Sequence, residues 1–416
     1  MKLNCMAVFV TGLMCLAQGE AAALSFDEAL SRAARAPEIL SGLAGEEAAL
    51  AAIRAAGQLP DPRLLLSVDD FMLEGELRHR FNGSKRMIGL MQEIPASAKR
   101  EAEREQAKAL LEASAREREY AQLAVRREVS LLWLKLYFLR EKEALLKASG
   151  AEIRLRQKTA TAALAGGDGA EMAVGALIDR QALDAELDLL ARDLQLVRAG
   201  LARWIGPLSP AETATGALPA WAEGASAALG EAPVASEAEP ETELRVSRSR
   251  IGMAEAEWRM AQADRNPDWS VEIGFGQDAM GQSMMMAKVG FSLPVFASAR
   301  QTPRIAAARA RLAAAEAEHA MRKAEFTRQR AELLAEEAAL SALLRRLTQE
   351  TLPLLERGVA LAEASFSGGK GSAAALIEAR EKKLAARMRA VDLEAERAAA
   401  RARLYFLQQR GENHHE

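Results

Sequence analysis

Sulfur side chains gather at one place in the sequence. Met280, Met284, Met285 and Met286 lie within a few residues of one another. Thioether sulfur favours soft metal ions, so this group suggests a route for copper or silver. The same residues also suit loop and lipid-facing positions that bind no metal. From the sequence alone we favour this second interpretation, and the first stays open.

The histidines form no recognisable catalytic or metal set. His319 falls on a seven-residue apolar series, where a polar side chain usually fixes helix register; a tunnel or metal role is the alternative. His414 and His415 lie in a polar tail, residues 411–416, and could instead hold a soft cation. No nucleophile–base pair, phosphate loop or metal-ligand spacing stands out. The sequence therefore predicts no enzyme activity, no cofactor and no metal site.

Residues 1–23 have the pattern of a cleaved export signal. A lysine precedes an apolar run, and three alanines offer a cleavage point before Leu24. Both cysteines, Cys5 and Cys15, would leave with this signal, so the mature chain would carry no thiol. Lipidation at Cys15 is the alternative, although the bulky Met14 precedes it. We expect an exported protein without disulfides.

The composition suits long, closely packed helices. Half of the 416 residues are hydrophobic, but only 5% are aromatic. The formal net charge of −3, with no basic stripe, argues against a nucleic-acid partner. After the signal, no apolar run reaches the ~18 residues of a membrane helix, so any membrane-spanning part is expected to be β.

Two stretches alternate as β-hairpins. In residues 268–294, large apolar side chains beginning with Trp269 alternate with small or polar ones, and Pro294 ends the second strand. Each strand is about ten residues long, enough for a tilted strand to cross a bilayer. Residues 62–95 predict a second hairpin with weaker alternation, because Asp69 adjoins another aspartate. The register of that hairpin stays open.

Long helices follow each hairpin. The first, from about residue 99 to 163, would be roughly 100 Å long. Its apolar residues recur every seven positions, as in a coiled coil, with an interruption at Arg118. In this first helix the series is Leu111, Val125, Leu132, Leu139, Leu146, Ile153 and Ala160. In the second long helix, which follows the second hairpin, it is Ile305, Leu312, His319, Phe326, Leu333, Leu340, Leu347, Leu354 and Leu361.

Local sequence signals predict where several helices begin or bend. Ser25 and Glu28 form a capping box for a short helix, and Pro37 suits the first turn of the next one, to about Gln58. Pro353 lies inside the second long helix and should kink it.

The pattern occurs twice, roughly 200 residues apart, which indicates an internal duplication. The first repeat is 24–205, with a glycine turn near 166–170. The second is 241–410, with a turn near 367–372. Residues 206–240 are rich in proline and glycine and predict a linker or equatorial segment. Two hairpins give four strands, too few to close a barrel, so several chains would have to pool their strands in a membrane.

Several segments together carry a resemblance to a known family, and this resemblance covers nearly the whole mature chain. The sequence resembles the TolC-type outer membrane factors (the outer membrane efflux protein family), and within them the outer membrane component of heavy-metal RND efflux pumps. The resemblance rests on the following segments: Pro60-Asp61-Pro62, Asn266-Pro267-Asp268, Val289-Gly290-Phe291-Ser292-Leu293-Pro294, and the glycine turns followed by Ala176-Leu177-Ile178-Asp179 and Ala375-Leu376-Ile377-Glu378.

This resemblance implies a mainly α fold with a small β part. Duplicated long helical hairpins would join two β-hairpins in a homotrimer with a 12-stranded transmembrane β-barrel in outer membrane lipid and a long periplasmic extension. A periplasmic adaptor and an inner-membrane RND transporter would be the partners of this exit duct. The adaptor would dock on the helix-hairpin tips, at Gly167, Gly169, Ile178, Asp179, Gly369, Gly371, Ile377, Glu378 and Arg380.

Two alternatives remain from the sequence. A periplasmic adaptor would have one long helical hairpin and a separate β-sandwich. A soluble coiled-coil scaffold would explain the seven-residue series but would leave the paired alternating strands without a purpose.

Overall fold

A computed structural model describes residues 23–71, 74, 84–165, 170–209, 212–223 and 242–409. Most of the expected export signal, the glycines Gly167 and Gly169, and His414 and His415 lie outside the described residues. The chain divides into two compact units. Unit 1 comprises residues 1–35, 128–228 and 337–402, and unit 2 comprises residues 36–127, 229–336 and 403–416.

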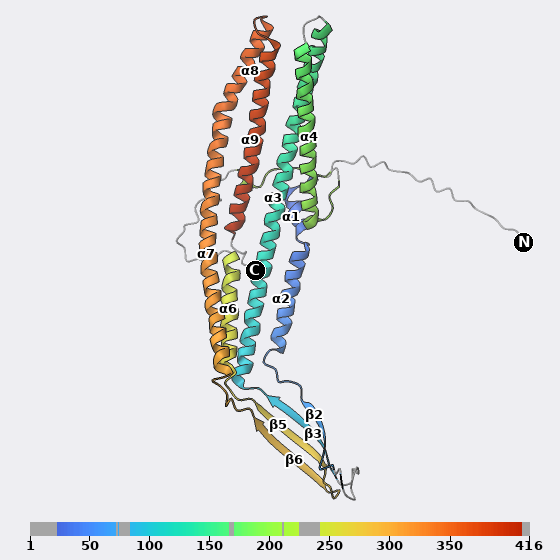
Figure 1. Cartoon of the computed structure of the whole chain (residues 1–416), viewed down its shortest axis with the longest axis vertical. Coiled ribbons are helices and arrows are strands. Elements are labelled where there is room, and N and C mark those ends of the chain that lie inside the picture. Colours follow the sequence, from blue (N-terminus) through green and yellow to red (C-terminus); the bar gives the residue numbers. More distant parts are fainter. Residues whose placement is uncertain are drawn as a thin grey trace, which may run out of the picture. The chain divides into compact units, whose positions relative to one another are not determined.

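The element order repeats once along the chain, with a short opening before the first copy (Figure 1). The opening is β1 (Ala23–Leu24) and α1 (Phe26–Ala33). The first copy is α2 (Pro37–Ala55), β2 (Arg63–Asp69), β3 (Lys85–Ile94), α3 (Ser97–Ala165) and α4 (Ala170–Ile205). Then come β4 (Thr213–Ala214) and α5 (Ala220–Glu223). The second copy is α6 (Thr242–Ala263), β5 (Trp269–Gln277), β6 (Ser283–Phe291), α7 (Gln301–Arg346), the π-helix η3 (Leu347–Thr351), α8 (Leu352–Ser367) and α9 (Ala373–Leu407).

The predicted fold class, mainly α with duplicated helical hairpins and two β-hairpins, is confirmed. Local signals account for the helix starts. The Ser25 side chain accepts a hydrogen bond from the Glu28 amide (3.2 Å), which caps α1. The Glu28 carboxylate does not complete the box but pairs with Arg32 one turn later. Pro37 stands in the first turn of α2, where its missing N–H costs nothing.

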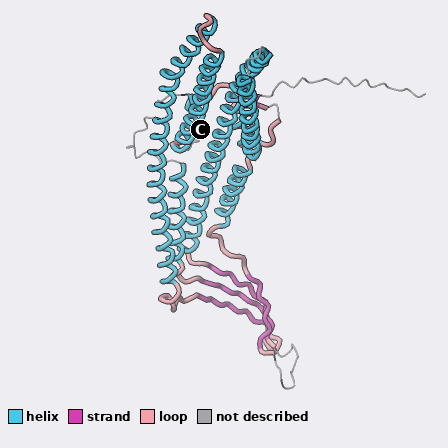
Figure 2. Tube along the Cα trace, turned by 45° about the horizontal axis from the view of Figure 1, so that its top comes forward, coloured by secondary structure: helices cyan, strands magenta, loops and turns pink. Residues whose placement is uncertain are grey.

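Unit 2 contains a four-stranded antiparallel sheet in the order β2-β3-β5-β6 (Figure 2). The two hairpins join through β3 and β5, in a register that includes Leu90 opposite Ile273. In the first hairpin, Leu64 lies opposite Leu90, which settles the register that the sequence left open.

The interruption of the seven-residue apolar series at Arg118 has a local cause within unit 2. A Cβ added at Gly42 of α2 would lie 3.3 Å from the Arg118 backbone, so the two helices approach closely there. The Arg118 guanidinium pairs with Glu46 of α2 (2.7 Å). A long side chain that ends in an ion pair replaces an apolar contact at this crossing.

In unit 1, the first helical hairpin packs around large apolar side chains. Trp133 and Leu24 are fully buried, and the Trp133 indole donates to the Leu24 carbonyl (2.9 Å). Leu24 lies in β1, which pairs in parallel with β4. Part of the predicted linker therefore folds onto this unit, since Trp221 of α5 also contacts Phe26.

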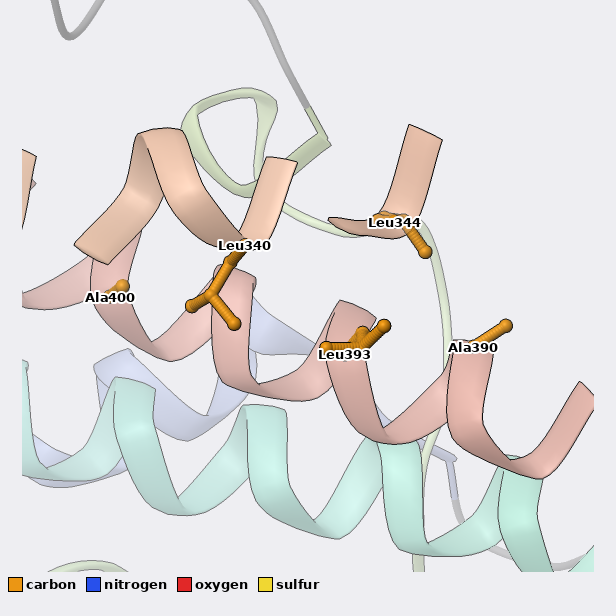
Figure 3. Packing of buried hydrophobic residues seen from close by; sticks show 5 residues of the cluster. All are labelled: Leu340, Leu344, Ala390, Leu393 and Ala400. Atoms are coloured by element: carbon orange, nitrogen blue, oxygen red, sulfur yellow. The ribbon is translucent and has the colours of Figure 1, made fainter. Parts of the chain in front are cut away.

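The second hairpin has a smaller core, which includes Leu340 and Leu344 of α7 packed on α9 residues Ala390, Leu393 and Ala400 (Figure 3). The expected distortion at Pro353 takes the form of the π-helix η3, which ends at Thr351, two residues before the proline. A π-turn accommodates a residue that cannot donate an amide hydrogen bond.

Because of this π-turn, the predicted seven-residue apolar series is wrong for the last part of the second long helix. Leu354 and Leu361 were expected on the same apolar series as Leu340, but they are 63% and 70% exposed. A π-turn inserts an extra residue and so rotates the following helix. Beyond it, Leu355 and Ala362 face inward, one residue later than the series, and Leu352 and Val359 lie on the same buried side. In the described part of the chain, no helix combines the length and apolarity needed to cross a membrane.

Candidate functional site

The tip of the second helical hairpin is a tight glycine turn. Beyond α8, Gly369 has φ +70°, a conformation that glycine adopts without strain. The amides of Lys370 and Gly371 both donate to the Ser365 carbonyl (3.0 and 2.9 Å), which closes the turn over the last carbonyls of the helix. A Cβ at Gly371 would lie 2.9 Å from the Ser365 Cβ. The two glycines therefore serve different purposes, one conformational and one steric.

Polar contacts hold the two helices of this tip together. Ser372 caps α9 by accepting from the Ala375 amide (3.1 Å). Arg380 of α9 donates to Glu363 of α8 (2.7 Å). Glu378 pairs with Lys382 on its own helix, and this hydrogen bond lowers the pKa of the Glu378 carboxyl. Of the predicted tip residues, Ile377 is half-buried, so Glu378 and the turn itself are the more accessible groups.

The first tip presents a different surface. Ile178 and Leu177 of α4 are 60% and 58% exposed, and Val174 is exposed to a similar degree. Their spacing places them on one face of the helix. Asp179 beside them is half-buried. Val174 and Leu177 were not among the predicted site residues, although apolar residues three and four apart directly after a glycine turn were a signal for such a patch.

One side of the sheet in unit 2 is an exposed apolar face. Alternation along the strands and the pairing register together place large apolar residues on one side. These side chains are 46% to 78% exposed. The residues of this exposed apolar face are Leu64, Leu66, Val68, Ile88, Leu90, Trp269, Ile273, Phe275, Met285, Val289 and Phe291. A patch of this extent marks an interaction surface.

The other side of the sheet, the polar face, carries glycines, serines and charged residues together with Leu65 and several methionines. Lys288 pairs with Glu272 across β5 and β6 (3.7 Å). The predicted methionine group is divided between three places. Met285 belongs to the exposed apolar face and Met280 to the hairpin turn, whereas Met284 and Met286 lie on the polar face.

The sheet has two open edges. Because β2 and β6 are its outermost strands, each has a described strand partner on one side only. Strand edges with free N–H and C=O groups are templates for pairing with another chain. An exposed apolar face with two such edges is suited to assembly with further copies.

His319 contacts a polar group on a neighbouring helix. Its Nδ1 lies 2.7 Å from the Ser247 hydroxyl of α6 and the ring is half-buried, so a neighbouring helix satisfies it. Within the described ranges, no group of three or more His, Cys, Asp or Glu residues is arranged to hold a metal ion.

Residues 236–408 match a family model described as "Outer membrane efflux protein". This match covers nearly all of the second repeat and agrees with the family resemblance seen in the sequence. No curated protein gives a significant sequence match.

Solved structures share the fold over nearly the whole chain. The outer membrane protein VceC from Vibrio cholerae is 18% identical, with a TM-score of 0.71, over 93% of this chain and 97% of that one. The outer membrane channel MtrE of Neisseria gonorrhoeae is 17% identical, with a TM-score of 0.72, over 93% and 89%. The outer membrane channel CmeC of Campylobacter jejuni is 14% identical, with a TM-score of 0.73, over 92% and 85%.

Proposed function

We propose that this chain, which carries the outer membrane efflux protein match and the fold of solved outer membrane channels, is the exit duct of a tripartite efflux system. It would conduct substrates passively from a pump and adaptor to the outside of the cell, and the pump would supply the energy. Its role is transport, with no catalytic step of its own.

The observation that carries this proposal is the exposed apolar face on a sheet with two open edges. Such a face is favourable in lipid, whereas free edge amides there cost several kcal/mol each. Additional copies remove the edges by pairing β6 of one chain with β2 of the next. We therefore propose a homotrimer that shares a closed transmembrane sheet in outer membrane lipid.

The adaptor alternative has no support in the structure. The described residues form two long helical hairpins and contain no β-sandwich. A soluble scaffold would leave the exposed apolar face without a purpose.

Fractionation tests the proposal directly. We expect the full chain in the outer membrane fraction, as a detergent-extracted trimer that dissociates on heating in SDS. A soluble periplasmic monomer would contradict it. As a built-in comparison, Ile273→Asp on the exposed apolar face should prevent insertion, whereas Glu272→Asp on the opposite face should not.

We further propose that the helix-hairpin tips receive a periplasmic adaptor. The first tip would contribute the exposed apolar side chains Ile178, Leu177 and Val174, with Asp179 at their border and Gly167 and Gly169 in the turn. The second would contribute Gly369, Gly371 and Glu378, with Ile377 and Arg380 supporting the turn. Exposed apolar groups bordered by charges are typical of protein docking surfaces.

Substitutions at both tips test adaptor docking. Ile178→Asp should abolish pump-dependent resistance while trimers still reach the outer membrane, because it places a charge in the apolar contact. A bulky residue at Gly371 or Gly169 should do the same. Gly175→Ala, where an added Cβ meets nothing within 4 Å, is the matched control. Resistance at the wild-type level in Ile178→Asp would show that the exposed apolar side chains of the first tip do not dock the adaptor.

The family resemblance also bears on the exported substrate. The resemblance to components of heavy-metal pumps supports metal ions as cargo. Deletion of the gene should then increase sensitivity to copper, silver, zinc or cobalt more than to antibiotics, and the opposite order would favour an organic substrate.

A further inference from the structure

Three methionines from two hairpins lie in adjacent rows on the polar face of the sheet. In one row of the register, Met87 of β3, Gly276 of β5 and Met284 of β6 lie side by side. In the next row, Gly274 separates Gly89 from Met286. The first hairpin therefore supplies a methionine that the cluster seen in the sequence did not include.

The glycines of β5 let these side chains converge. The Met87 Cε and the Met286 Cε lie 3.2 and 3.4 Å from the position that a Cβ on Gly274 would occupy. At Gly276 a Cβ would meet the Met87 Cγ at 2.8 Å. Methionine side chains from β3 and β6 thus lie over the backbone of β5, where the glycines have no side chain. All three methionines are half-buried, in contrast with Met285 and Met280.

The chemistry of this arrangement selects a particular class of ligand. Neutral thioether sulfurs bind soft monovalent ions such as Cu⁺ and Ag⁺ and discriminate against hard ions that need oxygen ligands. Neighbouring Glu272 pairs with Lys288 at 3.7 Å. A set of weak, uncharged ligands suits conduction, because an ion must be able to leave each site that it enters.

We propose that Met87, Met284 and Met286 form a binding site for a soft monovalent metal ion on the polar face of the sheet. This inference rests on the proposed function, in which the polar face lines the path of the exported substrate. It deepens that proposal by naming the cargo class and the side chains that contact it.

The test is titration of Ag⁺ into the purified, detergent-solubilised full chain, with sulfur coordination followed by X-ray absorption. Replacing Met87, Met284 and Met286 by leucine conserves volume and removes the sulfur atoms. We expect Ag⁺ affinity to fall at least about tenfold, or ~1.4 kcal/mol. The matched control replaces Met280 and Met285 by leucine, which should leave the affinity unchanged. An unchanged affinity in the triple variant, or no Ag⁺ binding by the wild type, overturns the site.

Cell experiments separate this inference from the proposed function. If the triple variant forms outer membrane trimers and loses silver tolerance while the control keeps it, the site is supported. If silver tolerance stays at the wild-type level in outer membrane trimers, the methionines only pack together and the inference fails, although the exit duct stands. Absence of the wild-type chain from the outer membrane would instead overturn the duct, whatever the Ag⁺ titration gives.

Discussion

The two helical hairpins have the same order of elements but are held together by different forces. In the part of the first hairpin that belongs to unit 1, large apolar residues fill the contact. Trp133, Leu136 and Leu201 are fully buried, and a Cβ added at Gly200 of α4 would lie 3.2 Å from the Leu132 side chain, so the two helices approach closely there. The second hairpin combines a smaller core of leucines and alanines with ion pairs between its helices, and of these pairs Arg401–Glu337 is the most buried.

The helices themselves differ in the same sense. α3 runs unbroken through 69 residues, whereas its counterpart contains the π-turn before Pro353. Glu356 of α8 accepts from both Lys383 and Arg387 of α9 (3.2 Å each). A duplicated chain can therefore keep one backbone path while one copy depends on apolar burial and the other adds ion pairs between its helices to a smaller apolar core. Charge-dependent contacts respond to pH and salt, and buried apolar contacts do not.

The largest expected effect is loss of the aromatic centre of the first hairpin. Trp133→Ala should lower the free energy of unfolding by about 3–5 kcal/mol, because it leaves a cavity and removes the indole hydrogen bond to the Leu24 carbonyl. Thermal unfolding of the purified protein measures this. Trp269→Ala, at an exposed position of the sheet, is the control. Equal losses from the two variants would contradict the assigned core.

A smaller effect is expected from the ion pair of the second hairpin. The Arg401 and Glu337 side chains are only 7% and 21% exposed, and Arg401 also donates to the Ala222 carbonyl. Arg401→Met should cost about 1.5–3 kcal/mol, the range for hydrogen bonds to charged groups. Arg389→Met, which removes an exposed pair with Glu396, should cost much less. Equal melting temperatures for the two variants would show that the Arg401–Glu337 ion pair does not stabilise this hairpin.

The same pair predicts a pH dependence. Burial alone would raise the pKa of Glu337, but hydrogen bonds from Arg401 and Ser341 outweigh it and bring the pKa below its ordinary value of 4.5. A lowered folded-state pKa contributes stability that is present above 4.5 and is lost as the pH falls through the folded value. Melting temperatures across this range should fall more for the wild type than for Glu337→Gln. Parallel curves would refute the linkage.

The smallest effect concerns the second tip. Arg380 and Glu363 are 35% and 49% exposed, so Arg380→Met should cost only about 0.2–1 kcal/mol, less at high salt. Limited proteolysis near residue 369 is the sensitive measurement. Lys382→Met, which removes a pair within one helix, is the control. Faster cleavage in the control than in Arg380→Met would show that the link between α8 and α9 does not stabilise the tip.

Much of the architecture followed from the sequence because it depends on short-range rules. A period of two fixes which side of a strand a residue occupies, as for Trp269, and a period of seven fixes the buried side of a helix, as for Val125. Ser25, Pro37 and the second glycine turn mark helix ends because each meets a local hydrogen-bonding or conformational need. The predicted tip residues followed from family resemblance, and their docking role stays a prediction.

Tertiary structure decided what these rules leave undetermined. The pairing of β3 with β5 joins segments far apart in the chain, and nothing local to either strand selects that partner or register. The convergence of Met87 with Met286 depends on this pairing. The same is true of helix phase, since the π-turn before Pro353 moved the buried face by one residue and exposed Leu354. Periodicity is a property of one segment, whereas pairing and packing depend on the free energy of many segments together, which no single stretch encodes.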